Sequence, residues 1–432
     1  MGAAKDKYKS NGSMPGDVLE WVDARFPLVS LWNDHMAKYY APKNFNFWYY
    51  FGSLALLVLV IQIVTGIFLV MHYKPDASLN ASGVPVAFAS VEYIMRDVPW
   101  GWLIRYMHST GASAFFLVVY LHMFRAMLYG SYQKPRELLW IFGVMIYLAL
   151  MAEAFMGYLL PWGQMSYWGA QVILNLFSAI PFGIGDALGV WIRGDYVIGD
   201  STLNRMFSFH VIAVPLVLVG LVVAHIMALH EVGSNNPDGV EIKKNKGPDG
   251  IPLDGIPFHP YYSVKDIVGF VVFLAVFAVI VFFAPEVGGY FLEYNNFIPA
   301  DPLVTPPHIA PVWYFTPFYS ILRANTVPFF WIDAKLWGVI FMALGVMVFF
   351  FLPWLDRSPV KSIRYRGPMY KIALTIFVIA FLILGYLGML APTPARTAVA
   401  QVCTILYFLF FLLMPIYTSL DKCKPVPERV TG

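Results

Sequence analysis

Long apolar stretches recur along the chain, and shorter polar segments separate them. Eight stretches are long enough, or nearly so, to cross a hydrocarbon core of about 30 Å as helices. They are residues 47–71, 106–128, 138–160, 206–229, 266–284, 336–352, 370–390 and 399–417. An amphipathic approach at 19–45 precedes the first. The pattern predicts an all-α, polytopic membrane protein with eight transmembrane helices.

The polar segments divide the chain into five expected parts. These are an amphipathic N-terminal segment (1–46), a four-helix bundle (47–230), a polar loop (231–265), a four-helix C-terminal part with a long outer loop (266–417) and a tail (418–432). Eight spans place both termini on one side. Of the 29 Lys and Arg residues, 21 fall in the two terminal segments and the even-numbered loops. The positive-inside rule therefore predicts cytoplasmic termini.

Composition supports the membrane assignment and excludes several sites. The chain is 59% hydrophobic, 17% aromatic and only 13% charged, far from soluble averages. A net charge of +3 gives no reason to expect a nucleic-acid partner. Cys403 and Cys423 lack the C-x-x-C-H or clustered spacing of covalent haem, iron–sulfur or zinc sites. The first 47 residues show no signal-peptide pattern, so no cleaved signal is expected.

Two of the apolar stretches each carry a pair of histidines. His108 and His122 are 14 residues apart, and His210 and His225 are 15 apart, so each pair shares one helix face about 21 Å apart along the axis. A single intramembrane histidine is usually a satisfied polar residue or part of a proton relay. Four in a matched arrangement instead predict bis-histidine ligation of two stacked, non-covalent b-type haems, His108 facing His210 on the outer side and His122 facing His225 on the inner side. Both axial positions are then filled, which favours electron transfer over oxygen binding.

Glycines and arginines repeat around these histidines. Glycines at 14-residue spacing on the first and third spans would let a flat macrocycle approach the backbone, although helix packing is the alternative explanation. Arginines within five residues of a histidine would pair with haem propionates, or simply extend to the membrane surface. The residues are Gly52, Gly66, Gly143, Gly157, Arg105, Arg125 and Arg205.

The longer loops have features of their own. Residues 163–180 show helical spacing after a Pro-Trp stop and predict a surface helix over the outer haem. Residues 305–323 are aromatic, rich in proline and too broken to span, which suits a pocket wall for an apolar ring. On the inner side, segments 230–237 and 258–266 bracket a Lys-, Gly- and Pro-rich insert that predicts an exposed loop.

Several stretches together resemble cytochrome b, the membrane subunit of the quinol:cytochrome c oxidoreductase (cytochrome bc) complex. They are RYMHSTGAS, LHMFRAMLYGSY, GYLLPWGQMSYWGA, LHEVGSNNP, PFHPYYSVKD and the tetrapeptide P-V-W-Y, in the family's order. The resemblance extends over residues 32–415, and it is to the form of the family that consists of one chain. It implies an eight-helix membrane protein that works as a homodimer with a Rieske iron–sulfur subunit and a c-type cytochrome subunit.

The resemblance also implies a protonmotive quinone cycle. Quinol is oxidised at an outer site, and quinone is reduced at an inner site after an electron has crossed both haems. Positions matching the outer pocket are Tyr158, Gly169, Ile173, Pro311, Trp313, Tyr314 and Tyr319. Positions matching the inner site are His230, Ser234, Lys265 and Asp266, of which His230 and Asp266 are titratable groups suited to proton delivery.

Two positions depart from the family's commonest pattern. The second histidine spacing is 15 instead of 14, and Pro215 between the two histidines allows a bulge or kink to absorb the extra residue. This spacing favours the cytoplasmic membrane of a bacterium over a mitochondrion. Val312 stands where the tetrapeptide usually has glutamate, so another group must accept the second quinol proton. Glu293, amid aromatic neighbours, and Glu286 are the expected candidates, with ordered water as the alternative.

Two other functions remain open at this point. A cofactor-free, proton-coupled transporter would explain eight spans and intramembrane histidines, but not the glycine repeats or the placement of the arginines. A di-haem membrane anchor of another quinone-linked dehydrogenase would explain the histidines, but needs only four or five spans.

Overall fold

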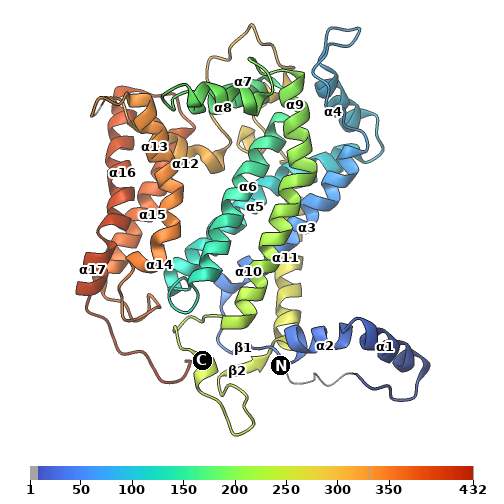
Figure 1. The fold of residues 1–432 in the computed structure, drawn as a ribbon, viewed down its shortest axis with the longest axis vertical. Coiled ribbons are helices and arrows are strands. Elements are labelled where there is room, and N and C mark those ends of the chain that lie inside the picture. Colours follow the sequence, from blue (N-terminus) through green and yellow to red (C-terminus); the bar gives the residue numbers. More distant parts are fainter. Residues whose placement is uncertain (1–7, 329, 432) are drawn as a thin grey trace.

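Eight membrane-length helical segments, all of them predicted, dominate the structure. The computed structural model describes residues 8–328 and 330–431. The spans are Phe47–Val70, Gly101–Tyr129, Glu137–Leu159, Asp200–Val232, Phe258–Phe283, Ala334–Leu355, Pro368–Gly388 and Pro394–Leu412. Both described ends of the chain lie at the same end of the bundle, which we call the inner end, and the opposite end is the outer end (Figure 1).

The spans are built mostly from single α-helices with short irregular turns. The elements of the spans are η2 (Phe47–Tyr49), α3 (Tyr50–Val70), α5 (Gly101–Tyr129), α6 (Glu137–Leu159), α9 (Asp200–Ser208), η3 (Phe209–Ala213), α10 (Val214–Val232), η5 (Phe258–Tyr262), α11 (Ser263–Phe283), α13 (Ala334–Met347), η9 (Val348–Phe351), α14 (Leu352–Leu355), α15 (Pro368–Gly388) and α16 (Pro394–Leu412). The long apolar runs leave each backbone group bonded within its own helix, which the hydrocarbon core requires.

The last span differs from its predicted bounds of 399–417. It begins earlier, where Thr393 caps α16 by accepting a hydrogen bond from the backbone N–H of Arg396. It also ends earlier, at Leu412, and a separate short helix, α17 (Met414–Leu420), follows. Pro415 has no backbone N–H to continue the helical ladder, which accounts for the break.

The spans form two groups that share one core. Helices α3, α5, α6, α10 and α11 lie together, and α13, α15 and α16 lie beside them with the shorter α12 (Thr316–Ala324) (Figure 1). Buried residues of both groups, including Tyr147, Tyr314, Phe318 and Tyr407, belong to one apolar cluster. Many apolar side chains on the outward faces of the spans are exposed, as expected of surfaces that contact lipid.

The inner end is more structured than the sequence predicts. Helices α1 (Met14–Arg25) and α2 (Leu28–Trp32) project sideways from the bundle (Figure 1). After η1 (Asn33–Ala37), β1 (Tyr40–Pro42) pairs antiparallel with β2 (Gly255–Pro257). The insert between 237 and 258 was expected to be exposed, and this is wrong for its first part, up to η4 (Ile242–Lys244), because Asp238 is fully buried and Ile242 is also buried.

At the outer end, short helices lie across the ends of the spans. Helix α7 (Gln164–Phe177) confirms the surface helix predicted at 163–180, and α8 (Ile184–Arg193) lies beside it (Figure 1). Helix α4 (Val86–Arg96) belongs to the first outer loop. The loop before α12 contains three short turns, η6 (Val287–Gly289), η7 (Tyr294–Phe297) and η8 (Trp313–Phe315).

Candidate functional site

The four intramembrane histidines form two facing pairs, as their spacing predicts. The ring centroids of His108 and His210 are 6.2 Å apart with planes at 88°. Those of His122 and His225 are 6.4 Å apart with planes at 60°. Helix α5 supplies one histidine of each pair, and the fourth span supplies the other. We call these the outer pair and the inner pair.

A bulge in the helix absorbs the extra residue between His210 and His225, as predicted, and it lies just before Pro215. Residues Phe209–Ala213 form a π-helical turn, η3, in which the N–H of Val214 bonds to the carbonyl of Phe209. A π-turn accommodates one additional residue without breaking the helix. The bulge contains His210 itself, so both histidines of this span can face α5 despite the spacing of 15.

Each histidine packs against one of the four predicted glycines. A methyl group at Gly157 would overlap the ring of His210, and one at Gly52 would lie 3.0 Å from Cε1 of His122. Methyl groups at Gly66 and Gly143 would lie 3.4 Å from Cε1 of His108 and His225, respectively. In this structure, therefore, each of the four predicted glycines leaves room for an imidazole ring of a histidine pair.

The geometry of both pairs fits an iron bound between the rings. Metal–imidazole bonds of about 2 Å on each side, plus the ring half-widths, put two centroids roughly 6 Å apart. At the outer pair, Nδ1 of His108 lies 2.9 Å from Thr65 Oγ1, and Nδ1 of His210 lies 3.0 Å from the carbonyl oxygen of Glu153. These contacts leave Nε2 of each ring for a metal. The described residues contain no cluster of three or more His, Cys, Asp or Glu side chains suited to a metal ion.

The predicted propionate arginines differ in their surroundings. Arg125 lies 5.1 Å above the ring of Tyr49, and its buried Nε has no hydrogen-bond partner among the described residues, which suits an anionic group. Arg105 is also partly buried at the outer end of α5. Arg205 is exposed and donates from Nη1 to the carbonyl of Trp191 on α8. Its side chain is therefore engaged away from the histidines.

A pocket of about 250 Å³ opens at the outer end. Among the predicted quinol-site residues it is lined by Tyr158, Pro311 and Trp313, together with Glu293 and the valine at 312. Burial raises the pKa of the Glu293 carboxyl, which also accepts hydrogen bonds from the backbone and side-chain N–H groups of Asn295. An apolar pocket with one carboxyl of raised pKa suits a ring that must lose a proton.

The remaining predicted outer residues do not line this pocket. Tyr314 is buried and stacks on Phe116 with ring centroids 3.9 Å apart. The hydroxyl of Tyr319 donates to the carbonyl of Ile309 at 3.4 Å. Gly169, Ile173 and Glu286 are also absent from the lining. Phe291, one of the aromatic neighbours of Glu293, and His308, within the predicted pocket wall at 305–323, also line it.

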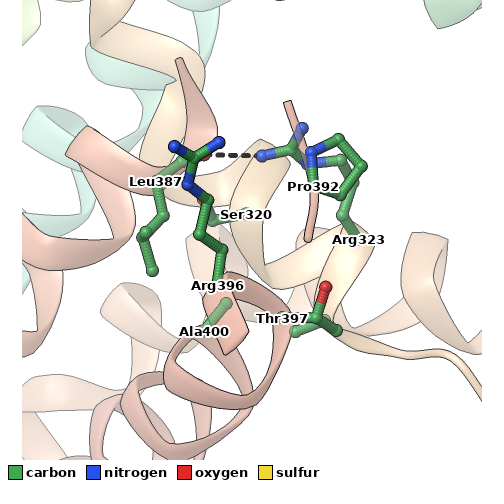
Figure 2. A pocket seen from close by; sticks show the side chains of 8 residues that line it. Ser320, Arg323, Leu387, Pro392, Arg396, Thr397 and Ala400 are labelled. Atoms are coloured by element: carbon green, nitrogen blue, oxygen red, sulfur yellow. Dashed lines mark hydrogen bonds between the residues drawn. The ribbon is translucent and has the colours of Figure 1, made fainter. Parts of the chain in front are cut away.

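A second cavity at the outer end is too small to hold a ring. It lies between α12, α15 and α16, and Arg323 and Arg396 point toward one another across it (Figure 2). Its volume is about 10 Å³, no more than the minimum that one water molecule needs. Arg323 donates to the carbonyls of Leu387 and Leu390, so its evident role is to tie α12 to the end of α15.

The predicted inner residues form two groups, one at the end of α10 and just beyond it, and one at the start of α11. The ring of His230 packs edge-on against that of His35 at 4.8 Å and lies 4.4 Å from that of Tyr39. The Tyr39 hydroxyl lies 3.0 Å from Ser234 Oγ. Sequence reasoning missed His35 and Tyr39, because only the folding back of the N-terminal segment brings them here.

The other two inner residues begin α11. Asp266 accepts a hydrogen bond from the hydroxyl of Ser53 on α3 at 3.2 Å. Nζ of Lys265 lies 4.5 Å above the ring of Tyr261. The structure thus groups His230 with Ser234, and it places Asp266 and Lys265 on a different helix, where each has its own partner.

Comparison with known proteins gives consistent matches over nearly the whole chain. The family profile "Cytochrome b/b6/petB" matches residues 36–233, and "Cytochrome b(C-terminal)/b6/petD" matches residues 299–408. Cytochrome b of Allochromatium vinosum is 63% identical over 418 residues, covering 96% of this chain and 98% of that protein. Cytochrome b of Rickettsia typhi is 48% identical, covering 98% of each. A solved chain of a "Hyperthermophilic respiratory Complex III" aligns with a TM-score of 0.82 and 38% identity, covering 93% of this chain and 99% of that one.

Proposed function

Since this chain belongs to the cytochrome b family and is the di-haem cytochrome b subunit of a bc complex, we propose that its two histidine pairs are the axial ligands of its haems. His108 and His210 would hold the outer haem, and His122 and His225 the inner one. The carrying observation is the separation of the rings, 6.2 and 6.4 Å in the two pairs. When bound, the two haems supply one-electron transfer across the membrane. Family membership also argues against a cofactor-free transporter and against another dehydrogenase's anchor.

The outer pocket is the proposed site of quinol oxidation. Quinol would lose two electrons and two protons there; a Rieske iron–sulfur subunit and the haem held by His108 and His210 would each accept one of the electrons. Trp313, Tyr158 and Pro311 would hold the ring, and the 250 Å³ pocket has room for it. In this role the chain is the quinol-binding catalytic subunit of quinol–cytochrome-c reductase.

Glu293 is the proposed acceptor of the second proton. Val312 lines the pocket at the position of the family's usual carboxylate, and a valine cannot accept a proton. The Glu293 carboxyl lines the same pocket, and burial raises its pKa, so it can take a proton from the ring at near-neutral pH more readily than an exposed glutamate. Glu286 does not line the pocket, which favours Glu293 of the two candidates.

Quinone reduction is proposed for the inner end. His230, at the inner end of its span, and Asp266, at the start of α11, would deliver the two protons that quinone takes up with two electrons. Ser234 and Lys265 would bind the ring carbonyls. Protons released at the outer end and taken up at the inner end contribute to the proton gradient.

The chain is an integral membrane protein that works in a multi-subunit complex. We propose that the complex is a homodimer that contains a Rieske subunit and a c-type cytochrome subunit. Its proposed location is the bacterial cytoplasmic membrane, with both termini in the cytoplasm. The excess of Lys and Arg at the inner end supports this orientation.

Reduced-minus-oxidised optical spectra of the purified complex test the haem assignment. Two b-type components are expected, with quinol-dependent reduction of a c-type cytochrome that stops when quinone-site inhibitors are added. A single b-type component, or spectra unaffected by quinol, would contradict the proposal.

A further inference from the structure

Glu153 is a carboxylate inside the apolar third span, about 9 Å along α6 from the end of the helix at Leu159. Its side chain is only 17% exposed. Ionisable residues at such depth are costly and usually serve a function within the protein. A lone carboxylate in an apolar span is itself a signal that the sequence contains.

The Glu153 side chain contacts the outer histidine pair. Its Oε1 lies 3.0 Å from Nδ1 of His210, and its backbone carbonyl oxygen lies at the same distance from that nitrogen. Its other oxygen, Oε2, is buried and has no hydrogen-bond partner among the described residues. The carboxylate is therefore committed to His210 and is not neutralised by a described cation.

The position of Glu153 follows from the repeat of glycines. Each histidine packs on a glycine, and the residue four positions before that glycine lies on the same helix face, one turn away. The four residues in that position are Trp48, Gln62, Leu139 and Glu153. Glu153 alone among them is ionisable, and its counterpart on the same helix at the inner pair is Leu139.

A carboxylate in this position changes the chemistry of the ligand. When the Nδ1–H of a metal-bound imidazole donates to a carboxylate, the imidazole becomes a stronger donor and its orientation is fixed. The negative charge and the stronger donor both stabilise the oxidised iron more than the reduced iron. Among the described residues, a carboxylate contacts His210 and no carboxylate contacts either histidine of the inner pair, so this effect is confined to the outer pair.

We infer that Glu153 is a positioning residue for His210 that lowers the reduction potential of the outer haem relative to the inner one. This inference rests on the proposed haem ligation. A lower potential at the outer haem makes electron transfer from it to the inner haem more favourable. Glu153 thus helps to set the direction of the electron's path across the membrane.

Redox titration of the two haems in the assembled complex tests the inference. Glu153→Leu introduces the residue that stands at the equivalent position of the inner pair, Leu139. Glu153→Gln keeps an acceptor oxygen but removes the charge. We expect the outer haem's potential to rise in both variants, and most in Glu153→Leu. The equilibrium constant for electron transfer between the two haems should then change by about tenfold, which corresponds to about 59 mV for a one-electron couple. Glu153→Asp keeps the charge and should stay closest to the wild type.

The inner haem provides the matched control. Its potential should not move in any Glu153 variant, and the reciprocal change Leu139→Glu should lower it. Because two b-type components in the spectrum establish haem ligation first, failure of the ligand assignment is seen separately. An unchanged outer potential in both Glu153→Gln and Glu153→Leu, or loss of the outer haem from all three variants, would overturn the inference.

Discussion

The two ends of the bundle are held together in different ways. At the inner end, Glu241 pairs with both Arg136 and Lys361, joining three separate loops. Nearby, Arg366 and Asp356 form a fully buried ion pair. The Asp238 carboxylate accepts hydrogen bonds from four residues, Arg364, Tyr365, Thr431 and Asn44. Among the described ion pairs at the outer end, only Arg96–Glu92 joins a carboxylate to a cation with a fixed charge, and both partners are on one helix.

The outer end instead relies on aromatic packing and on bonds to backbone carbonyls. Tyr120 donates to the carbonyl of Tyr314, and Trp313 donates to the hydroxyl of Ser113. Such contacts fix the pocket wall without placing fixed charges beside an apolar ring. Ion pairs therefore stabilise the loops of the inner end, whereas the lining of the outer pocket contains one carboxylate, Glu293, and no Lys or Arg.

Removing a haem ligand is expected to have the largest effect, because it should remove the haem at one end of the bundle and leave the haem at the other end. His225→Ala should remove the inner haem and leave the outer one, because its partner His122 alone provides only one axial bond. His210→Ala should remove the outer haem and is expected to impair assembly of the complex. Optical and low-temperature spectra that resolve the two b-type components measure this. Two intact components in His225→Ala would refute the pairing.

At the outer pocket, Glu293→Gln should lower steady-state quinol oxidation by about tenfold, within the range of general-base catalysis. Since burial raises the pKa of Glu293, the wild-type rate should fall as the pH drops through that raised value and the carboxylate gains a proton. The Gln variant should lose this limb of the pH profile. Val312→Glu added to Glu293→Gln should restore part of the rate.

Glu286→Gln is the matched control for this experiment, because Glu286 lies in the same loop but outside the pocket lining. A Glu293→Gln enzyme with the normal rate and pH profile would assign the proton to another acceptor.

At the inner site, His230→Ala and Asp266→Asn should each slow re-oxidation of the inner haem by quinone, by about tenfold, while outer quinol oxidation is spared. Stopped-flow or flash kinetics follow the two steps separately. His259→Ala is the control, since His259 is at the same end but contacts Trp32 and Ser263 instead. Equal slowing in all three variants would show a general effect on the inner end.

The smallest effect is expected at the inner ion pairs. Glu241→Gln leaves Arg136, whose side chain is 3% exposed, without its charge partner and should cost on the order of 2–3 kcal/mol of stability. Asp254→Asn should cost about 1 kcal/mol or less, because its partners Lys43 and Arg429 are 43% and 48% exposed. Thermal unfolding in detergent, followed by haem absorbance, measures both.

The pH dependence of this stability has a defined sign. Burial alone would raise the pKa of Glu241, but Arg136 and Lys361 hold it at about 2, below the ordinary 4.5. The pairing therefore stabilises the fold fully above pH 4.5, and this contribution is lost as the pH falls toward 2. A Glu241→Gln protein that lost as much stability in that window as the wild type would assign the acid sensitivity to other groups.

Much of this protein is determined by local sequence. Hydropathy alone locates the eight spans, because a helix in lipid needs only its own length of apolar residues. Helical periodicity alone places His108 and His122 on one face, and it predicted the pairs that the structure contains. The bulge upstream of Pro215 was also foreseeable, since the extra residue must be absorbed within one helix.

Other features depend on how separate helices pack. No local pattern shows that the N-terminal segment folds back to set Tyr39 and His35 against His230, or that Asp238 becomes fully buried beneath the last residues of the chain. The contact of Glu153 with His210 likewise depends on the rotation of α6 relative to the fourth span. Periodicity fixes which residues share a face of one helix, whereas the neighbour that this face meets is set by packing across the whole bundle.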